Sequence, residues 1–437
     1  MTATFTEKSL SNIWEIYGLI SDPFYVGPIL VFGGNLPRST FIGRNKEKKR
    51  LLAILRSRGG SRILVSGEPG VGKTSFVNVV RSEALDAGFF TPMKEIGVQP
   101  EWEANDFILN TLFAIYNTLV RQSKEEVLSK NLFLELQKLV TSVNISSYSG
   151  SISVAGYGVG GSKNDVPNVQ QITTSYLLDI FERIILDLTS KESFSEVIIH
   201  YNNLENFKSD ELALLFKRIR DFILTEKVHF IFVGDLTVPP IIQSVPRAQS
   251  IFSDTPIILE SLSFEETLQI LEKRVETLKI PGLTHVTPYT VDAVKLLYDL
   301  YNGNIRYILN SLSTAIRELS TERPIILDNE IISNILSKVA EDRWLSKLSH
   351  WEKEILGSML NKKEMSNKEL SQKLHKKPQN ISKALKKLQE ISSIYLNRTE
   401  GTSKLYAVHP SVKWFLLSNK TKNKIDDENL LKYFVFI

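Results

Sequence analysis

The sequence of 437 residues contains no cysteine, which excludes disulfides, thiolate metal ligands and cysteine nucleophiles. Its six histidines do not occur in paired metal-ligand spacings, so no zinc site is expected. No uninterrupted apolar run reaches about 18 residues, and residues 1–14 lack the basic start and apolar centre of a signal peptide. These absences predict a cytoplasmic protein without a membrane partner.

Charge is unevenly distributed along the chain. The formal net charge is only +4, but residues 346–424 contain 17 Lys and Arg against 6 Asp and Glu. This stretch therefore carries +11 and the remainder of the chain −7. Such asymmetry suggests that the basic part meets a polyanion. A solvated, lysine-rich surface is the alternative explanation.

The stretch GEPGVGKTS, residues 67–75, matches the phosphate-binding pattern G-x-x-x-x-G-K-[ST]. An apolar run before it predicts a short buried strand, and the residues after it predict a helix. Glycines let the backbone approach phosphates closely, so its N–H groups and the helix N-terminus face negative charge. Lys73 is expected to reach the β and γ phosphates and Thr74 to bind Mg²⁺. The pattern predicts that ATP or ADP is bound by Gly67, Glu68, Pro69, Gly70, Val71, Gly72, Lys73, Thr74 and Ser75.

The segment FIGRNKEKKRLLAIL, residues 41–55, is a Gly-Arg turn leading into a basic amphipathic helix. Together with the phosphate loop, it resembles the entry element of AAA+ ATPases, especially archaeal origin-recognition initiators and the related STAND-type signalling ATPases. The resemblance implies that Arg44 contributes to the nucleotide site and that SDPFYVGPI, residues 21–29, covers the adenine edge. A helix cap and an aromatic core plug are the structural alternatives.

The stretch IIHYNNLE, residues 198–205, lacks acids where the resembled family has two. Asn202 and Asn203 align with those acids, and Glu205 aligns with a third. Asn202 can still accept a hydrogen bond from water on Mg²⁺, but an amide cannot act as a general base. We expect hydrolysis to be slow or absent, with Glu205 or Asp235 as fallback acids. The alternative is that another acid restores normal catalysis.

Two stretches after the amides fit the same resemblance. HFIFVGDL, residues 229–236, resembles the strand that senses the γ-phosphate, with Asp235 where the family often has Asn. Residues 246–275 resemble the segment that carries a trans-acting arginine. Arg247 would be that arginine, acting on a neighbouring subunit and implying self-association. An ordinary surface arginine is the alternative.

The stretch YNGNIRYIL, residues 301–309, matches the Gly-Asn-x-Arg motif of the family's helical lid. The resemblance implies that Gly303 and Asn304 cap the preceding helix and that Arg306 points towards the γ-phosphate. Alternatively, Arg306 only pairs with a helix end.

The stretch SSYSGSISVAGYGVGGS, residues 146–162, interrupts the predicted core with small, uncharged and β-branched residues. It predicts a glycine-rich hairpin or mobile loop, with a disordered linker as the alternative. As an uncharged β-prone segment, it could pair with a neighbouring subunit or a protein partner.

The basic end resembles a winged helix–turn–helix. Helical patterns cover 349–361, 366–375 and 378–391, the second opening with a Ser-x-x-Glu capping box, and two short β-rich stretches follow. In such modules the third helix enters a DNA major groove and the wing meets the backbone, although some serve as protein docking modules. The resemblance implies base contacts by Gln379, Asn380 and Ser382 and further DNA contacts by Lys376, Lys377, Lys383, Lys386, Lys387, Arg398 and Lys404.

These interpretations predict an α/β P-loop NTPase core with a parallel sheet, a helical lid and a C-terminal winged helix–turn–helix. The expected boundaries are 1–40 for the adenine-covering segment, 41–260 for the core with its insert near 146–164, 261–345 for the lid, 346–424 for the winged helix and 425–437 for the tail. The expected function is an ATP-controlled, double-stranded-DNA-binding factor of initiator-like or regulatory type. A STAND-like scaffold that oligomerises with a protein partner, and a helper ATPase of a mobile element, remain open.

Overall fold

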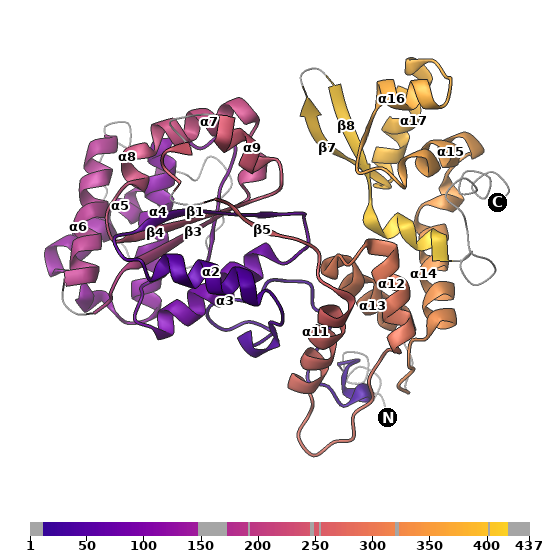
Figure 1. Cartoon of the computed structure of the whole chain (residues 1–437), viewed down its shortest axis with the longest axis horizontal. Coiled ribbons are helices and arrows are strands. Elements are labelled where there is room, and N and C mark those ends of the chain that lie inside the picture. The colour runs from indigo at the N-terminus through magenta and orange to yellow at the C-terminus, as the bar shows by residue number, and fades with distance from the viewer. Residues whose placement is uncertain are drawn as a thin grey trace, which may run out of the picture. The chain divides into compact units, whose positions relative to one another are not determined.

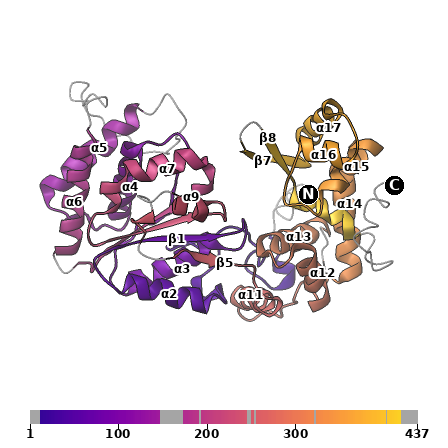
Figure 2. The same ribbon diagram turned by 45° about the horizontal axis from the view of Figure 1, so that its top comes forward.

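The computed structural model describes residues 12–146, 173–190, 193–244, 249–252, 255–319, 323–400 and 403–417. The chain divides into two compact units, and Figures 1 and 2 show both as ribbons. Gly27–Ser261 forms the core unit, and the residues on both sides of it form the flanking unit. No helix within the described ranges is long and apolar enough to cross a membrane.

A five-stranded sheet forms the centre of the core unit, with strand order β2-β3-β4-β1-β5 and parallel pairing throughout. Parallel sheets are covered on both faces, and accordingly every residue of β1 and β4 is buried. The predicted parallel sheet is thus confirmed. The strands are β1 Ser61–Gly67, β2 Ile96–Gly97, β3 Val197–Asn202, β4 Val228–Gly234 and β5 Ile257–Leu259.

Helices cover both faces of this sheet. The alternation of side chains along β4 sends Phe230 and Phe232 into one apolar cluster and Ile231 and Val233 into another. Helices α2 and α3 lie on one side of the strands and α4, α7 and α9 on the other (Figure 1). The elements are η3 Arg38–Thr40, α2 Asn45–Leu55, α3 Lys73–Asp86, α4 Ala104–Arg121, η4 Glu125–Val127, α5 Lys130–Ser146, α6 Thr174–Ser190, η7 Leu204–Asn206, α7 Ser209–Arg218, α8 Arg220–Ile223 and α9 Val238–Ser244.

The flanking unit begins with residues before Gly27, which pack on helices from much later in the chain. Asp22 accepts a hydrogen bond of 2.6 Å from Ser313 Oγ, and Arg274 donates to the carbonyls of Pro23 and Tyr25. The predicted adenine-covering segment is therefore divided between the two units at Val26. The helices here are η2 Glu15–Tyr17, α11 Phe264–Thr277, α12 Val291–Tyr301, α13 Ile305–Leu319, α14 Asn329–Arg343 and η8 Leu345–Lys347.

The basic C-terminal part contains the helices and strands that its pattern predicts. Ser366 Oγ accepts a hydrogen bond from the Glu369 backbone N–H, and Glu369 accepts one from the Ser366 N–H, which confirms the capping box. A short strand, β6, joins β7 and β8 in an antiparallel sheet of order β6-β8-β7. The elements are α15 His350–Met359, β6 Met365–Ser366, α16 Asn367–Lys373, α17 Pro378–Glu390, β7 Ile394–Glu400, β8 Ser403–Val408 and η9 Pro410–Leu416.

Three sequence predictions fall outside the described residues. They are the arginine at position 247, the glycine-rich stretch after Ser146 and the tail 425–437.

Candidate nucleotide-binding site

The phosphate loop joins the carboxyl end of β1 to the start of α3, as its motif predicts. Two glycines are required by the geometry. A Cβ at Gly67 would lie 2.4 Å from the Leu259 carbonyl oxygen on β5, so only glycine lets these strands approach. Gly72, the N-cap of α3, has φ 95°, a left-handed conformation that glycine adopts without strain. Gly72 has no side chain to cap α3, and the N-terminal end of a helix favours anions.

Lys73 is only 8% exposed, and its ammonium group lies within the phosphate loop. Its Nζ donates to the carbonyl oxygens of Gly67 at 2.8 Å and Glu68 at 3.1 Å. These contacts hold a positive charge at the mouth of the loop. A bound phosphate would therefore replace loop carbonyls as the partner of this ammonium group.

Arg44 supports the phosphate loop from outside. It is the N-cap of α2 in a left-handed conformation, and it is 7% exposed. Its guanidinium donates to the carbonyl of Val71 at 3.4 Å and to that of Glu260. These two hydrogen bonds connect the phosphate loop to the end of the sheet through Arg44.

The two amides differ in their surroundings. Asn202 is the last residue of β3, and its Nδ2 donates a hydrogen bond of 3.1 Å to Thr74 Oγ1. Asn203 adopts a left-handed backbone conformation with φ 70°, which asparagine tolerates better than most residues. A Cβ on Gly97 of β2 would lie 3.5 Å from its Nδ2, so the Asn203 side chain lies against that strand. Of these two amides, only Asn202 forms a side-chain hydrogen bond to the phosphate loop in the described structure.

Two carboxylates follow the central strands. Glu205 lies in η7 and is exposed, but neighbouring protein partly desolvates its carboxyl and raises its pKa. The charge of Lys73 acts to lower this pKa, and the charge of Asp235 acts to raise it. Both charges therefore influence the Glu205 carboxyl. Asp235 Oδ1 accepts a hydrogen bond of 2.8 Å from the Thr237 N–H. Asp235 therefore stabilises the turn after β4.

The phosphate-loop helix also holds the start of the core unit. Ser75 Oγ accepts from the Ile29 N–H at 3.2 Å, and Asn78 Nδ2 donates to the Ile29 carbonyl at 3.1 Å. One turn further on, the fully buried Arg81 donates to Thr91 Oγ1 and Asn78 Oδ1. Burial lowers the pKa of Arg81 to about 10, so the group stays cationic at neutral pH. Sequence reasoning missed this network, because Asn78 and Arg81 match no motif and meet their partners only in three dimensions.

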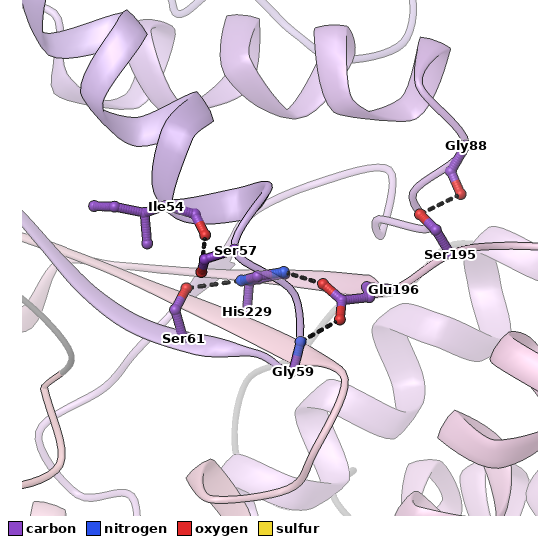
Figure 3. A network of polar contacts seen from close by, with 8 residues as sticks. All are labelled: Ile54, Ser57, Gly59, Ser61, Gly88, Ser195, Glu196 and His229. Carbon is purple, nitrogen blue, oxygen red and sulfur yellow. Dashed lines mark hydrogen bonds and ion pairs between the residues drawn. The ribbon is translucent and has the colours of Figure 1, made fainter.

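A buried serine–histidine–glutamate series lies at the amino ends of the strands, away from the phosphate loop (Figure 3). Ser61 Oγ lies 2.7 Å from His229 Nδ1, and His229 Nε2 lies 2.5 Å from Glu196 Oε2. Glu196 also accepts from the Gly59 N–H at 2.6 Å. The three side chains belong to residues no more than 4% exposed, so a substrate has no access to Ser61. The series joins the starts of β1, β3 and β4 and is structural.

Comparison with known proteins assigns the core. Residues 40–222 match the AAA ATPase domain family. This part of the chain is similar to AAA ATPase domains. Over nearly its whole length, the chain is 21% identical to an uncharacterised HTH-type transcriptional regulator of Methanocaldococcus jannaschii, covering 94% of this chain and 97% of that protein.

The chain also resembles several solved structures at low sequence identity. The Aeropyrum pernix ORC1 protein in complex with DNA is 16% identical, with a TM-score of 0.43 over 94% of this chain and 96% of that one. Cdc6p of Pyrobaculum aerophilum is 13% identical, with a TM-score of 0.43 over 95% and 99%. The RuvB Holliday junction branch migration motor of Thermotoga maritima is 13% identical, with a TM-score of 0.39 over 88% and 97%.

The matched range 40–222 contains most, but not all, of the residues predicted to bind the nucleotide. Arg44, the phosphate loop, Asn202 and Glu205 lie inside the matched range, whereas Asp235 and Arg306 lie after it. Arg306 is in the first turn of α13 in the flanking unit. The left-handed cap before it is formed by Asn302 and Gly303, one residue earlier than predicted, while Asn304 accepts the first hydrogen bonds of α13.

The predicted DNA-contact residues lie mostly on the exposed side of α17, but several already have partners. Lys387 Nζ lies 2.7 Å from Glu352 Oε2, Ser382 Oγ accepts from Asn367 Nδ2, and Lys376 lies over the Trp351 ring. Lys386 Nζ lies 3.9 Å from Glu390 Oε1, a long ion-pair distance. Exposed members of the set are Lys376, Lys377, Gln379, Asn380, Ser382, Lys383, Lys386 and Lys404. Arg398 pairs with Leu405 in the β7–β8 register.

Proposed function

We propose that the protein is an ATP-binding switch with slow or absent hydrolysis, which binds double-stranded DNA through residues 349–417. The observation that carries the nucleotide part is the contact from Asn202 Nδ2 to Thr74 Oγ1 at the end of an intact phosphate loop. The loop, Lys73 and the start of α3 provide phosphate contacts. The position beside Thr74 carries an amide, which supplies neither charge nor a proton-accepting base.

ATP hydrolysis by the purified protein tests this directly, with and without duplex DNA. Wild type is expected to bind ATP and to hydrolyse it at least about 100-fold more slowly than a working ATPase, because a general base contributes about 10²–10⁴ in rate. An Asn202→Asp/Asn203→Glu variant is expected to gain turnover. Glu at position 203 must adopt the left-handed conformation, so its folding is checked by circular dichroism.

A Lys73→Ala variant serves as the control for contaminating ATPases. Turnover of wild type near 10 s⁻¹ that Lys73→Ala abolishes would contradict the deficient site. In that case Glu205, whose carboxyl pKa is influenced by the charge of Lys73, is the residue to replace next.

We further propose that two arginines respond to the γ-phosphate. Arg306 acts within its own subunit, and Arg247 acts on the nucleotide of a neighbouring subunit in a self-associated pair. Their alanine variants are expected to lose ATP-over-ADP discrimination, measured by binding.

DNA binding is supported by the local charge of +11 and by the order of elements in residues 349–417, which is that of a winged helix–turn–helix. The M. jannaschii relative is described as an HTH-type transcriptional regulator, which points the same way. Binding to duplex DNA is expected to weaken steeply between about 50 and 200 mM salt, because lysines release counterions from phosphates. Fluorescence anisotropy with a labelled duplex measures this slope.

A protein-docking role, as in a STAND-like scaffold, is the second candidate. It is favoured by the intramolecular partners of Lys387, Ser382 and Lys376, which occupy part of the predicted DNA surface. Absence of salt-dependent DNA binding, together with an ATP-dependent increase in mass by light scattering, would support the scaffold.

A further inference from the structure

The side chain next to Thr74 determines how the nucleotide site meets a divalent cation. In phosphate loops of this pattern, the Thr hydroxyl is a ligand of Mg²⁺. Here Asn202 Nδ2 donates to Thr74 Oγ1 at 3.1 Å and occupies one of the two lone pairs on that oxygen. If the amide turns and presents its oxygen, it accepts a hydrogen bond from the hydroxyl. In neither orientation does it bring negative charge.

The residues around Thr74 fit Mg²⁺ only in part. Proteins usually hold this ion through one or two carboxylates together with substrate phosphates. The hydroxyl of Thr74 is a suitable ligand, but the residue bonded to it is an amide, and Asn203 faces Gly97 on β2. Among the described residues, no three His, Cys, Asp or Glu side chains form a group that could hold a metal. A Mg²⁺ ion here would depend on the nucleotide's own phosphates and one hydroxyl.

The loss of a carboxylate at position 202 changes the affinities for the two nucleotide forms in opposite directions. A carboxylate attracts Mg²⁺ and its waters, so an amide weakens the binding of the metal complex. A carboxylate also repels the phosphates of a metal-free nucleotide, so an amide strengthens the binding of that form. The buried ammonium of Lys73 and the N-terminal end of α3 are positive partners for metal-free phosphates.

We propose that this site binds nucleoside di- and triphosphates with little dependence on Mg²⁺, and that Asn202 is the residue responsible. The proposal rests on the nucleotide binding proposed above. It differs from that function, which concerns hydrolysis, because it predicts a property of binding alone. The free nucleotide, and not only its magnesium complex, is then a ligand of the switch.

The experiment is calorimetric titration of the full chain with ADP and with ATP, once in excess Mg²⁺ and once in excess EDTA. For wild type, the two Kd values are expected to agree within about threefold. For Asn202→Asp, binding in EDTA is expected to be at least about tenfold weaker than in Mg²⁺, because the new carboxylate restores both electrostatic effects.

Asn206→Asp is the matched control. It adds the same charge in the adjacent η7 at an exposed position, and its ratio of Kd values is expected to stay that of wild type. Wild-type binding only in Mg²⁺, or an unchanged ratio in Asn202→Asp, overturns the proposal. Failure of wild type to bind under both conditions overturns the proposed nucleotide function instead. Circular dichroism and melting temperature confirm that each near-isosteric variant is folded.

Discussion

The indole N–H of Trp414 donates a hydrogen bond of 2.7 Å to the hydroxyl of Ser311, 103 residues earlier in the chain. Trp414 lies in η9, which follows strand β8, and Ser311 lies in the middle of α13. Both residues are buried. A second contact runs from Tyr301 Oη to the Pro410 carbonyl at 3.3 Å. Helix α13, which carries Arg306 in its first turn, is therefore packed against the end of the basic C-terminal part within one unit.

Replacement of Trp414 tests this connection. Trp414→Phe keeps most of the apolar packing but removes the donor, at an expected cost of about 1 kcal/mol in the free energy of unfolding. Trp414→Ala also leaves a cavity and is expected to cost about 3–5 kcal/mol. Denaturant unfolding followed by probes in each unit measures both, since two units need not unfold together. If Trp414→Phe and Trp414→Ala lowered the free energy of unfolding equally, η9 would not be packed on α13 in solution.

Gly303 follows α12 and packs closely against Leu262, the residue at which the chain returns to the flanking unit. An added Cβ would meet the Leu262 carbonyl at 2.8 Å and the Tyr298 ring, and the φ of Gly303 is 74°. Gly282 has a similar φ of 81° but nothing within 4 Å of its Cβ. We expect Gly282→Ala to cost about 1–2 kcal/mol from the left-handed conformation, and Gly303→Ala to cost clearly more because of the added clash. Melting temperatures compare the two, and similar losses would rule out close contact with Leu262.

His229 is expected to make the core unit sensitive to acid. Burial, with a smaller effect of Arg62, lowers the pKa of His229, although Glu196 acts to raise it. A neutral ring accepts from Ser61 at Nδ1 and donates to Glu196 at Nε2. Protonation of Nδ1 would reverse the first bond, with Ser61 Oγ then accepting, and would place a positive charge in a buried site. Because the unfolded chain binds this proton more readily, the stabilising contribution is present above the ordinary pKa near 6.5 and is lost as pH falls towards the folded value.

Urea unfolding between pH 7.5 and 5 measures this loss, whose limiting slope is about 1.4 kcal/mol per pH unit for one proton. His229→Gln is expected to be less stable at neutral pH and to lose less of its remaining stability on acidification. The pKa values of His200 and His409 are also lowered by burial, so part of the acid sensitivity remains in the variant. An identical pH dependence in wild type and variant would contradict the role of His229.

Lys383 and Lys387 lie one turn apart on α17 and provide a matched pair. Lys383 is exposed, whereas Lys387 forms an ion pair with Glu352, whose carboxyl has its pKa lowered despite partial desolvation because Lys387 and Ser349 are bonded to it. If α17 contacts DNA phosphates, Lys383→Ala is expected to weaken binding more than Lys387→Ala and to reduce the salt slope by about 1. Anisotropy titrations at several salt concentrations measure both. A larger effect of Lys387→Ala would mean that DNA displaces Glu352.

Local patterns predicted several elements correctly because their causes are local. The glycines of the phosphate loop and the apolar run before it were enough to predict the loop. The apolar run forms β1 Ser61–Gly67, and the helix after the loop starts at Lys73. The Ser366 capping box likewise needs only residues three positions apart. The apolar run within residues 229–236 predicted a strand and forms most of β4 Val228–Gly234, whose residues are all buried.

Short motifs were enough to predict a phosphate loop and to locate amides where the resembled family has acids. The surroundings of each amide became clear only from the folded chain, because Asn202 contacts Thr74 across 128 residues while Asn203 lies against Gly97. No pattern in the sequence predicted the partners of Lys387, Ser382 and Trp414 either. Such contacts depend on which distant surfaces fold together, and no periodicity or short motif records that pairing.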